Sequence, residues 1–479
     1  MIFSSVPFLY YFFPVVILLS LAVSRRQQDG RRTAGRLTNS ILLLASLFFY
    51  GYGEPKYLLL MVFSILSAWA LGLLVPKSRL AFLVSVVISL GLLGWFKYAD
   101  FFVESFAAVT GIPAEPLGIA LPIGISFYTF QILSYTIDLR RGKIAPQRNL
   151  IRFAMYVSLF PQLIAGPIVV YKNVEPQLDP HARIITAESL YGGARRFLMG
   201  LGKKVLLANQ LGQLTEIFGG LDAADRSVAF YWIYALAFSL QIYFDFSGYS
   251  DMAIGLGRML GFTFPENFNY PYISRSITEF WRRWHMTLGG WFREYVYIPL
   301  GGNQVSFGRW VCNLFVVWAL TGLWHGAAWT FVVWGLFHGL LLLLEKRWLG
   351  GILAKVPTFA AHAYTLLLVG ISMVIFNADS LQEAGEYLLS MFGLGSVSAG
   401  STLTWYYLRS YGLLLMAAIF GATPLPKKIV GCIEERAGKT DFGKKVLEWA
   451  EPAALACLLL VVTAYLVDGS FNPFLYFRF

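Results

Sequence analysis

Five histidines occur in the chain, and three of them lie in segments rich in tryptophan and glycine. His285 belongs to WRRWHMTLGG, whereas His325 and His338 belong to LTGLWHGAAWTFVVWGLFHG. Burial favours the neutral imidazole, which is the form that a general base requires. An ionisable residue in a hydrophobic segment is a candidate functional residue. His285 and His325 are therefore the leading catalytic candidates, while His181 and His362 lie at segment edges and are not.

Helical spacing around His285 sorts the neighbouring side chains by face. A continuous helix would place Trp281, Trp284 and His285 on one face and direct Arg282 and Arg283 elsewhere. The arginines are then candidates to attract an anionic substrate group, and the tryptophans are candidates to line the site. The structural alternative is an interfacial amphipathic helix whose histidine is merely hydrogen-bonded in the core.

His325 lies between two long apolar runs, next to Trp324, which is a further candidate for substrate contact. In one straight helix, His338 would point about 140° away from His325. For His338 we therefore favour packing against Trp334 over substrate binding. A break near Gly326 would change this geometry, and the small glycine leaves room for a ligand or another helix.

Two carboxylates interrupt the hydrophobic segment YFDFSGYSDMAIGLGRMLGF, at Asp245 and Asp251. Carboxylates at membrane depth are costly, so they indicate a cavity wall or a functional pair that contacts substrate. The alternative is a position at the membrane interface.

The composition of the 479 residues is 57% hydrophobic and 14% charged. An ordinary globular chain is about one quarter charged, so a disordered chain and a soluble multidomain enzyme are both excluded. The net charge of +11 fits loops that contact anionic lipid and set topology, and no nucleic-acid partner is expected. The three cysteines are not spaced as metal ligands or as a disulfide framework, and no metal site is expected.

Long apolar runs predict an all-α, polytopic integral membrane protein of roughly 11–12 transmembrane helices. We expect a proline-broken re-entrant segment at 150–170 and an amphipathic interfacial helix at 186–216. A single membrane domain then covers 1–479. The apolar runs are 1–24, 37–52, 57–75, 80–97, 117–137, 228–246, 309–326, 328–345, 362–378, 404–422 and 453–467.

Basic residues predict the orientation in the membrane. Five arginines between 25 and 36 follow the first apolar run, which places the N-terminus outside the cytoplasm. The C-terminal tail from Asp468 is then also extracytoplasmic. The chain lacks a G-x-S-x-G elbow, a P-loop and H-E-x-x-H, which disfavours nucleotide-driven coupling and zinc hydrolysis.

The two histidine motifs, WRRWHMTLGGWFREYVYIPLGGN and LTGLWHGAAWTFVVWGLFHG, resemble the membrane-bound O-acyltransferase family. The likeness is greatest to its bacterial branch of alginate O-acetylation proteins and peptidoglycan O-acetyltransferases. Further matches are the aspartate segment, the opening MIFSSVPFLYYFFPVV, ASLFFYGYGEPKY and the tail FNPFLYFRF, so the resemblance extends over essentially the whole chain.

This resemblance implies a bundle of helices around a central tunnel, with acyl groups taken from a cytoplasmic thioester and delivered outside. It implies that His325 is the catalytic residue and that His285 is the second functional position. No bound cofactor is expected. Acetyl-CoA is the favoured donor, with its phosphates near Arg282 and Arg283, and an acyl carrier protein is the other possibility.

The resemblance also implies a bacterial plasma (inner) membrane location, a polysaccharide acceptor and an extracytoplasmic esterase-like acetyltransferase partner. Our hypothesis is an O-acetyltransferase for exopolysaccharide or cell-wall modification. The alternatives are D-alanyl transfer to teichoic acid and, from another class, a glycan or lipid transporter or flippase. A structural scaffold is a third class, but it leaves the histidine motifs unexplained.

Overall fold

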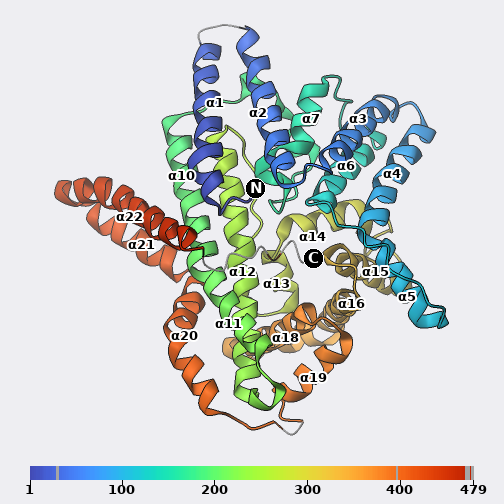
Figure 1. Ribbon diagram of the computed structural model, residues 1–479, viewed down its shortest axis with the longest axis vertical. Coiled ribbons are helices and arrows are strands. Elements are labelled where there is room, and N and C mark those ends of the chain that lie inside the picture. Colours follow the sequence, from blue (N-terminus) through green and yellow to red (C-terminus); the bar gives the residue numbers. More distant parts are fainter. Residues whose placement is uncertain (29–31, 395–396, 470–474, 476–479) are drawn as a thin grey trace. The chain divides into compact units, whose positions relative to one another are not determined.

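A computed structural model describes residues 1–28, 32–394, 397–469 and 475, and every regular element within them is a helix. The described chain divides into two compact units (Figure 1). The first unit contains 1–197, 249–266 and 293–295, and the second contains 198–248, 267–292 and 296–479. The all-α class expected from the sequence is confirmed.

The first unit is built from the N-terminal helices. They are η1 (Phe8–Phe12), α1 (Phe13–Gln28), α2 (Arg32–Gly53), α3 (Leu58–Leu74), α4 (Arg79–Leu93), η2 (Gly94–Tyr98), α5 (Ala99–Thr110), α6 (Ile125–Arg140), α7 (Leu150–Ser158), α8 (Phe160–Leu163), α9 (Tyr171–Val174), η3 (Glu175–Leu178), η4 (Pro180–Ala182) and most of α10 (Ala187–Gly202). Of the 16 residues of α6, 14 are buried, including its polar groups. This part of the apolar run at 117–137, with its polar side chains, therefore faces the protein interior.

The proline-containing segment of the first unit is broken, as its sequence predicts. The chain turns between α7 and α8 at Leu159, whose ψ of 111° is not helical. Its proline, Pro161, stands in the first turn of α8, where a missing backbone N–H costs little. Residues 153–169 are buried, which is the condition under which non-helical backbone is tolerated at membrane depth.

The second unit carries both histidine motifs. Its elements are η5 (Lys203–Ala208), α11 (Asn209–Gly220), η6 (Ala223–Asp225), the larger part of α12 (Val228–Met259), η7 (Pro271–Ile273), α13 (Ile277–Arg283), α14 (Met286–Phe292), α15 (Phe307–His325), α16 (Trp329–Leu344), η9 (Glu345–Leu349), α17 (Gly350–Leu353), α18 (Thr358–Asn377), α19 (Leu381–Met391), α20 (Thr402–Gly421), α21 (Leu425–Ala437) and α22 (Asp441–Val467). The remaining element, η8 (Arg293–Tyr297), is divided between the units. Helix α16 packs against α15, α13, α18 and α19.

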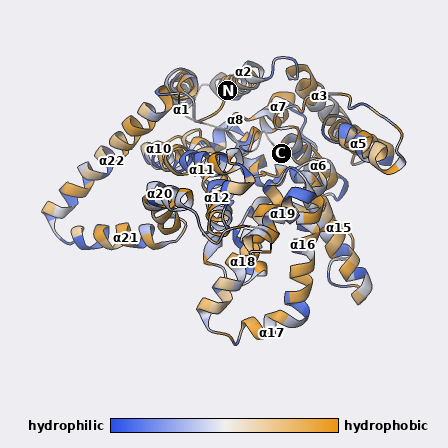
Figure 2. Cartoon of the chain, turned by 60° about the horizontal axis from the view of Figure 1, so that its bottom comes forward, coloured by the Kyte–Doolittle hydropathy of each residue, from blue (hydrophilic) through white to orange (hydrophobic). Residues whose placement is uncertain are grey.

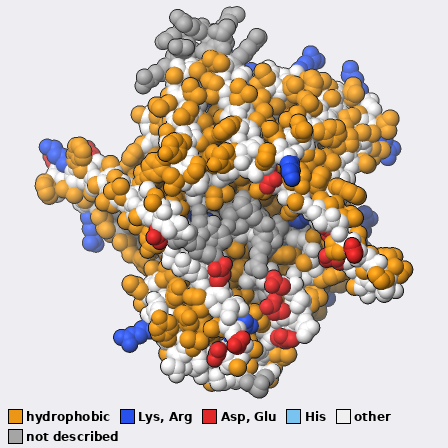
Figure 3. All heavy atoms as spheres, in the orientation of Figure 1, with side chains coloured by type: hydrophobic (Ala, Val, Ile, Leu, Met, Phe, Trp, Pro, Cys, Tyr) orange, Lys and Arg blue, Asp and Glu red, His pale blue; other side chains and the backbone are white. Residues whose placement is uncertain are grey.

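Six helical segments among the described residues are long and apolar enough to cross a membrane, and a seventh results if the bent α20–α21 pair is one span. The six are 79–110, 228–259, 307–325, 329–353, 358–377 and 441–467. Large hydrophobic side chains on their outer surfaces are exposed, as lipid contact requires; Leu413 and Leu460 are 77% and 69% exposed. Helices such as α5 and α22 are coloured mainly as hydrophobic in Figure 2, and hydrophobic side chains cover most of the upper part of the face drawn in Figure 3, whereas Asp and Glu side chains gather in its lower part.

These helices of the described residues pass a test of length and composition alone, and other apolar runs of the sequence form shorter or buried helices. Three further apolar helical segments, at 8–24, 37–53 and 58–74, each contribute 17 residues to the described part of the chain. The run at 117–137 becomes the buried α6 rather than a lipid-facing span. The arginine side chains between 25 and 36 and most of the tail after Asp468 lie outside the described residues.

The interfacial helix expected at 186–216 is corrected by the structure. It consists of α10, η5 and α11, and Lys204 in η5 is buried rather than exposed to headgroups. The physical reason is a carboxylate: Lys204 Nζ lies 2.5 Å from Oδ1 of Asp245. A buried ammonium group is tolerated when such a partner is present.

Candidate active site

A break in the helix positions His285. The continuous helix that we expected is wrong, because α13 ends before Trp284 and α14 begins after His285. His285 has a φ of +44°, a left-handed conformation that residues other than glycine rarely adopt. The backbone N–H of Met286 donates to the carbonyl of Asn267, and that of Thr287 to the Asn267 side chain. The strained backbone is thus held by the preceding loop, as is common at functional sites.

The His285 side chain is buried and oriented by Asn267. Nδ1 of His285 lies 3.2 Å from Oδ1 of Asn267, which also accepts from Oγ1 of Thr287 at 2.9 Å. Because a carboxamide oxygen can only accept, Nδ1 must donate, and Nε2 retains its lone pair. The residue lies outside the candidate spans, and burial, aided by neighbouring His325, lowers its pKa well below the usual histidine value. His285 is therefore neutral near pH 7.

His325 is the last residue of α15, and Gly326, Ala327 and Ala328 separate it from α16. Gly326 is extended, with φ −161° and ψ 156°, so the break expected there is confirmed. The glycines of the motif let α15 and α16 approach closely. A Cβ atom on Gly322 or Gly335 would lie 2.2 Å from a backbone oxygen of the other helix. A Cβ atom on Gly326 would lie 2.1 Å from the ring of Phe331 in α16, so the space beside Gly326 is taken by another helix, one of the two expectations for that glycine.

The structure brings the two predicted catalytic histidines together. The imidazole rings of His285 and His325 are 6.3 Å apart between centroids. The ring of Trp324 lies 5.7 Å from His285 and 5.0 Å from His325. On its other side His325 contacts Trp334 at 5.1 Å and Phe376 at 5.4 Å, so both histidines stand among aromatic rings.

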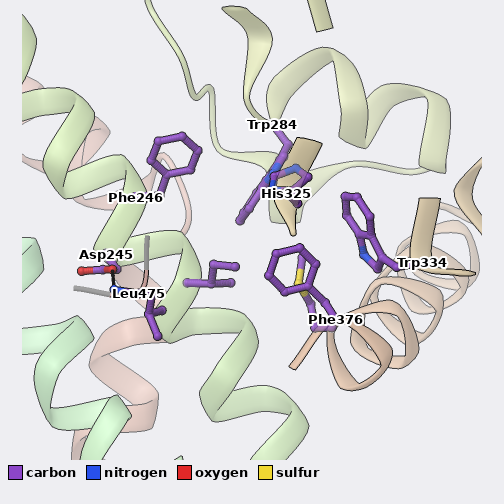
Figure 4. Close-up of a pocket in the computed structure, with 9 residues that line it drawn as sticks. Asp245, Phe246, Trp284, His325, Trp334, Phe376 and Leu475 are labelled. Atoms are coloured by element: carbon purple, nitrogen blue, oxygen red, sulfur yellow. Dashed lines mark hydrogen bonds between the residues drawn. The ribbon is translucent and has the colours of Figure 1, made fainter. Parts of the chain in front are cut away.

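A small hollow of about 20 Å³ lies beside His325. Figure 4 shows His325, Trp284, Trp334 and Phe376 on one side of it and Asp245 on the other. Its lining is mainly apolar, so it is suited to an uncharged group. The lining residues are Ile242, Asp245, Phe246, Trp284, His325, Trp334, Met373, Phe376 and Leu475.

The two aspartates of α12 have separate cations. Asp245, which lines the hollow, forms its ion pair with Lys204, and both side chains are 3% exposed. Asp251 belongs to the first unit and accepts from Arg196 at 2.9 Å, and Glu266 binds the same guanidinium. Of the two predicted cavity-wall residues, Asp245 lines the hollow, whereas Asp251 belongs to the ion-pair cluster with Arg196 and Glu266.

His338 belongs to a buried network of rings behind the hollow. Nε1 of Trp281 donates to Nδ1 of His338 at 3.1 Å, and the rings of Trp318 and Trp334 pack around them. This arrangement matches the structural role that we favoured for His338. Nε1 of Trp334 and Nε2 of His338 are buried without a hydrogen-bond partner in the described part of the chain.

A second, larger hollow lies at the start of α13. This cleft has a volume of about 730 Å³, and its walls include Arg275, Arg282 and Lys346. Oxygen atoms of Glu345 cap α13 by accepting from its first two backbone N–H groups at 2.6 and 2.8 Å. Arg283 lines neither hollow, because its guanidinium binds Glu279 at 2.9 Å.

Comparison with known proteins explains why these groups lie together. The family model described as "MBOAT, membrane-bound O-acyltransferase family" matches residues 143–381. The chain is 37% identical over 534 aligned residues to the probable alginate O-acetylase AlgI of Pseudomonas syringae pv. tomato, with both chains covered completely. It is 33% identical to the peptidoglycan O-acetyltransferase of Helicobacter pylori, over 91% of each chain. The teichoic acid D-alanyltransferase of Bacillus subtilis is 30% identical over 46% of this chain and 58% of its own.

The chain belongs to the membrane-bound O-acyltransferase family. It is therefore a multi-pass membrane protein and an O-acyltransferase, as the histidine motifs predicted. The family match includes His285, His325 and His338, the break at Gly326 and the cationic walls of the cleft. Leu475 lies beyond it.

Several site residues of this O-acyltransferase were missed by sequence reasoning. Asn267 is an ordinary loop asparagine in sequence, and nothing in its neighbourhood indicates a bond to His285. Phe246 directly follows Asp245, yet it contacts His285 at 4.6 Å. Leu475 is separated from His325 by most of the C-terminal helices. Signals were available for three of the site residues: Trp334 was named as a packing partner, and Phe246 and Leu475 lie in segments that match the family.

Proposed function

We propose that this O-acyltransferase moves an acetyl group from a thioester donor across the membrane to hydroxyl groups of an extracytoplasmic polysaccharide. The meeting of His285 and His325 in one buried, aromatic site carries the proposal. The names of the alginate and peptidoglycan relatives support acetyl as the transferred group and a glycan as the acceptor.

In the proposed reaction, His325 is the general base. It accepts the proton of the attacking hydroxyl as the oxygen bonds to the thioester carbonyl carbon. The tetrahedral intermediate then collapses, the C–S bond breaks, and the departing thiolate takes the proton from the His325 imidazolium. General base catalysis of this kind contributes about 10²- to 10⁴-fold to a rate.

Trp334 is the proposed donor to the developing oxyanion. Neutral His285 cannot donate from Nε2 while Nδ1 donates to Asn267, so it does not suit the carbonyl oxygen. Trp334 lines the hollow, and its buried indole N–H has no acceptor among the described residues. A preorganised donor in a water-poor site is well suited to stabilise negative charge. His285 then acts as an acceptor that orients a hydroxyl group.

The cleft beside α13 is the proposed binding site for the donor. Among the described residues, the side chains of Arg275 and Arg282 form no ion pair, so they are available to phosphate oxygens. Lys346 adds a third positive charge to the same walls. Acetyl-CoA, which carries phosphates, fits this chemistry, and a phosphopantetheine-bearing acyl carrier protein is the alternative donor. Basic residues favour the cytoplasmic side for this cleft.

We place the enzyme in the bacterial plasma membrane with both termini outside the cytoplasm, as the distribution of basic loops indicates. The acetyl group must then pass through a tunnel between the helices. An extracytoplasmic esterase-like protein is the proposed partner that completes transfer to the glycan, because the sequence has no serine nucleophile elbow of its own.

The test is to measure ester-linked acetate and D-alanine released from the cell envelope by mild base. Cells with the wild-type chain are compared with a deletion and with His325→Ala at matched protein level. The matched control is His181→Ala, because His181 is exposed. We expect acetate to fall to the deletion level in His325→Ala and to remain at the wild-type level in the control.

The other outcomes separate the alternative functions. Loss of D-alanine instead of acetate would indicate that the enzyme acts in teichoic acid modification. The partial likeness to the D-alanyltransferase is the observation that supports this alternative. No change in either ester in the deletion would contradict acyl transfer and favour a transporter.

A further inference from the structure

The hollow beside His325 is closed by a residue from the C-terminal tail. Leu475 is 8% exposed and forms part of the lining, although α22 ended at Val467. Figure 4 shows its side chain beside Asp245, with a dashed line from its backbone to that carboxylate. Leu475 is thus distant in sequence from the histidine motifs but a neighbour of the catalytic candidate in space.

A buried ion pair holds Leu475 in this position. The backbone N–H of Leu475 donates to Oδ2 of Asp245 at 3.3 Å, while Oδ1 of the same carboxylate binds Lys204. A buried carboxylate is expensive unless its oxygens have partners, and here one oxygen is taken by an ammonium group and the other by the tail. The proposed proton transfer uses neither Lys204 nor Asp245. We therefore assign this ion pair a positioning role, which is to hold the backbone of Leu475.

The size of the hollow limits what can stand beside His325. Its volume is about 20 Å³, and a cavity needs roughly 10–15 Å³ to hold one water molecule. A methyl group is of similar size to water. Phe246, Trp284, Trp334 and Phe376 contribute large, stiff rings to the walls, and Ile242 of α12 and Met373 of α18 contribute aliphatic side chains. Leu475 differs from both groups because it lies beyond α22, outside the packed helices.

We propose that Leu475, held by the Lys204–Asp245 pair, sets the length of the acyl group that the enzyme transfers. The proposal rests on the proposed acetyl transfer at His325 and specifies its substrate class as acyl groups of two carbons. The acetyl methyl occupies the hollow with its carbonyl toward His325. A propionyl group adds one methylene, which overlaps with the Leu475 side chain.

The expected selectivity follows from the pocket chemistry. One methylene too many in a hydrophobic pocket changes the specificity by about 10- to 200-fold. Shortening Leu475 to alanine removes three carbon atoms from the wall, so room for the extra methylene appears without a change at His325. Enlarging Leu475 to phenylalanine has the opposite effect.

The experiment uses intact cells grown with propionate, in which acetyl and propionyl thioesters are both present. Esters are released from the envelope by mild base, and the propionyl-to-acetyl ratio is divided by the ratio of the intracellular thioesters. The variants are Leu475→Ala and Leu475→Phe, and the control is Leu460→Ala on the exposed surface of α22. We expect the corrected ratio to rise about tenfold or more in Leu475→Ala. In Leu475→Phe it should lie below the wild-type ratio, and in the control it should remain at that ratio.

Each other outcome overturns a defined statement. An unchanged ratio in both Leu475 variants, with acetate still transferred, would overturn the length limit alone. Loss of all ester in both variants at matched protein level would also overturn it, because Leu475 would then be required for folding or catalysis itself. A wild-type chain that yields neither ester would remove the proposed acetyl transfer and this proposal with it.

Discussion

The hollow beside His325 is small and walled by aromatic rings, whereas the cleft at the start of α13 is open and carries three cationic side chains. Their volumes are about 20 and 730 Å³. Helix α13 borders the cleft with Arg282, and Trp284, directly after its end, faces the hollow. Two neighbouring sites of opposite character are thus built from one short segment.

The difference teaches where binding and chemistry belong. In a buried hollow, the field of an N–H group acts through a low dielectric and is worth several kcal/mol. In an open cleft, water and salt weaken each charge, and recognition depends on several cations together. Substitutions in the hollow should therefore change the rate of the chemical step, and those in the cleft should change the affinity for the donor.

The largest effect is expected for Trp334→Phe, which keeps the ring and removes the N–H. If this group stabilises the oxyanion, kcat should fall about 100-fold, as when an oxyanion-hole donor is removed, with little change in the donor KM. Steady-state acetyl transfer in membrane vesicles is the measurement. Trp348→Phe is the control, because Trp348 is 61% exposed. A change in KM without a change in kcat would contradict this role and indicate that Trp334 contributes to binding of the donor.

A smaller effect, on the KM for the donor rather than on kcat, is expected for Arg282→Gln in the cleft. Removing one cation that contacts phosphate should raise the KM for acetyl-CoA about ten- to thirtyfold, corresponding to one charged hydrogen bond, and leave kcat almost unchanged. The effect should shrink at high salt. Arg309→Gln is the matched control, since Arg309 is exposed and does not line the cleft. An equal KM in the two variants would contradict donor binding in the cleft.

The contrast between the hollow and the cleft was only partly predictable from the sequence. His285 and His325 were identified because ionisable groups are rare in apolar segments and stand out by residue type. Arg282 was identified for the same reason, but its neighbour Arg283 could not be distinguished from it. The two differ in the structure because Glu279 lies one helical turn before Arg283 and binds it as an i,i+4 ion pair.

The parts that sequence reasoning missed depend on backbone breaks and long-range contacts. Helical periodicity assumes an unbroken helix, so it failed at the left-handed conformation of His285. The bond from Asn267 to His285 and the bond from Leu475 to Asp245 join segments that no local pattern connects. Apolar runs are equally compatible with burial in protein and with lipid contact, so the run at 117–137 does not by itself distinguish the buried α6 from a lipid-facing span.

The smallest effect expected concerns His285 and the stability of the folded enzyme. Its folded-state pKa is lowered by burial, whereas in the unfolded chain it lies near the ordinary value of about 6.5. As pH falls below about 6.5, His285 becomes protonated in the unfolded state but stays neutral in the folded state. The free energy of unfolding is thus unaffected by this group above that pH. Toward acid pH it decreases by at most about 1.4 kcal/mol per pH unit.

The thermal unfolding midpoint in detergent micelles, followed from pH 7.5 to about pH 5, tests this linkage. His285→Gln has no titrating group, so its midpoint should fall less steeply toward acid pH than that of the wild type. His181→Gln should keep the wild-type slope, because His181 is exposed. Equal slopes in wild type and His285→Gln would mean that His285 accepts a proton in the folded protein. A protonated His285 has no lone pair with which to accept a hydrogen bond from a substrate hydroxyl. The surroundings of His285 would then tolerate a charge, as the open cleft does.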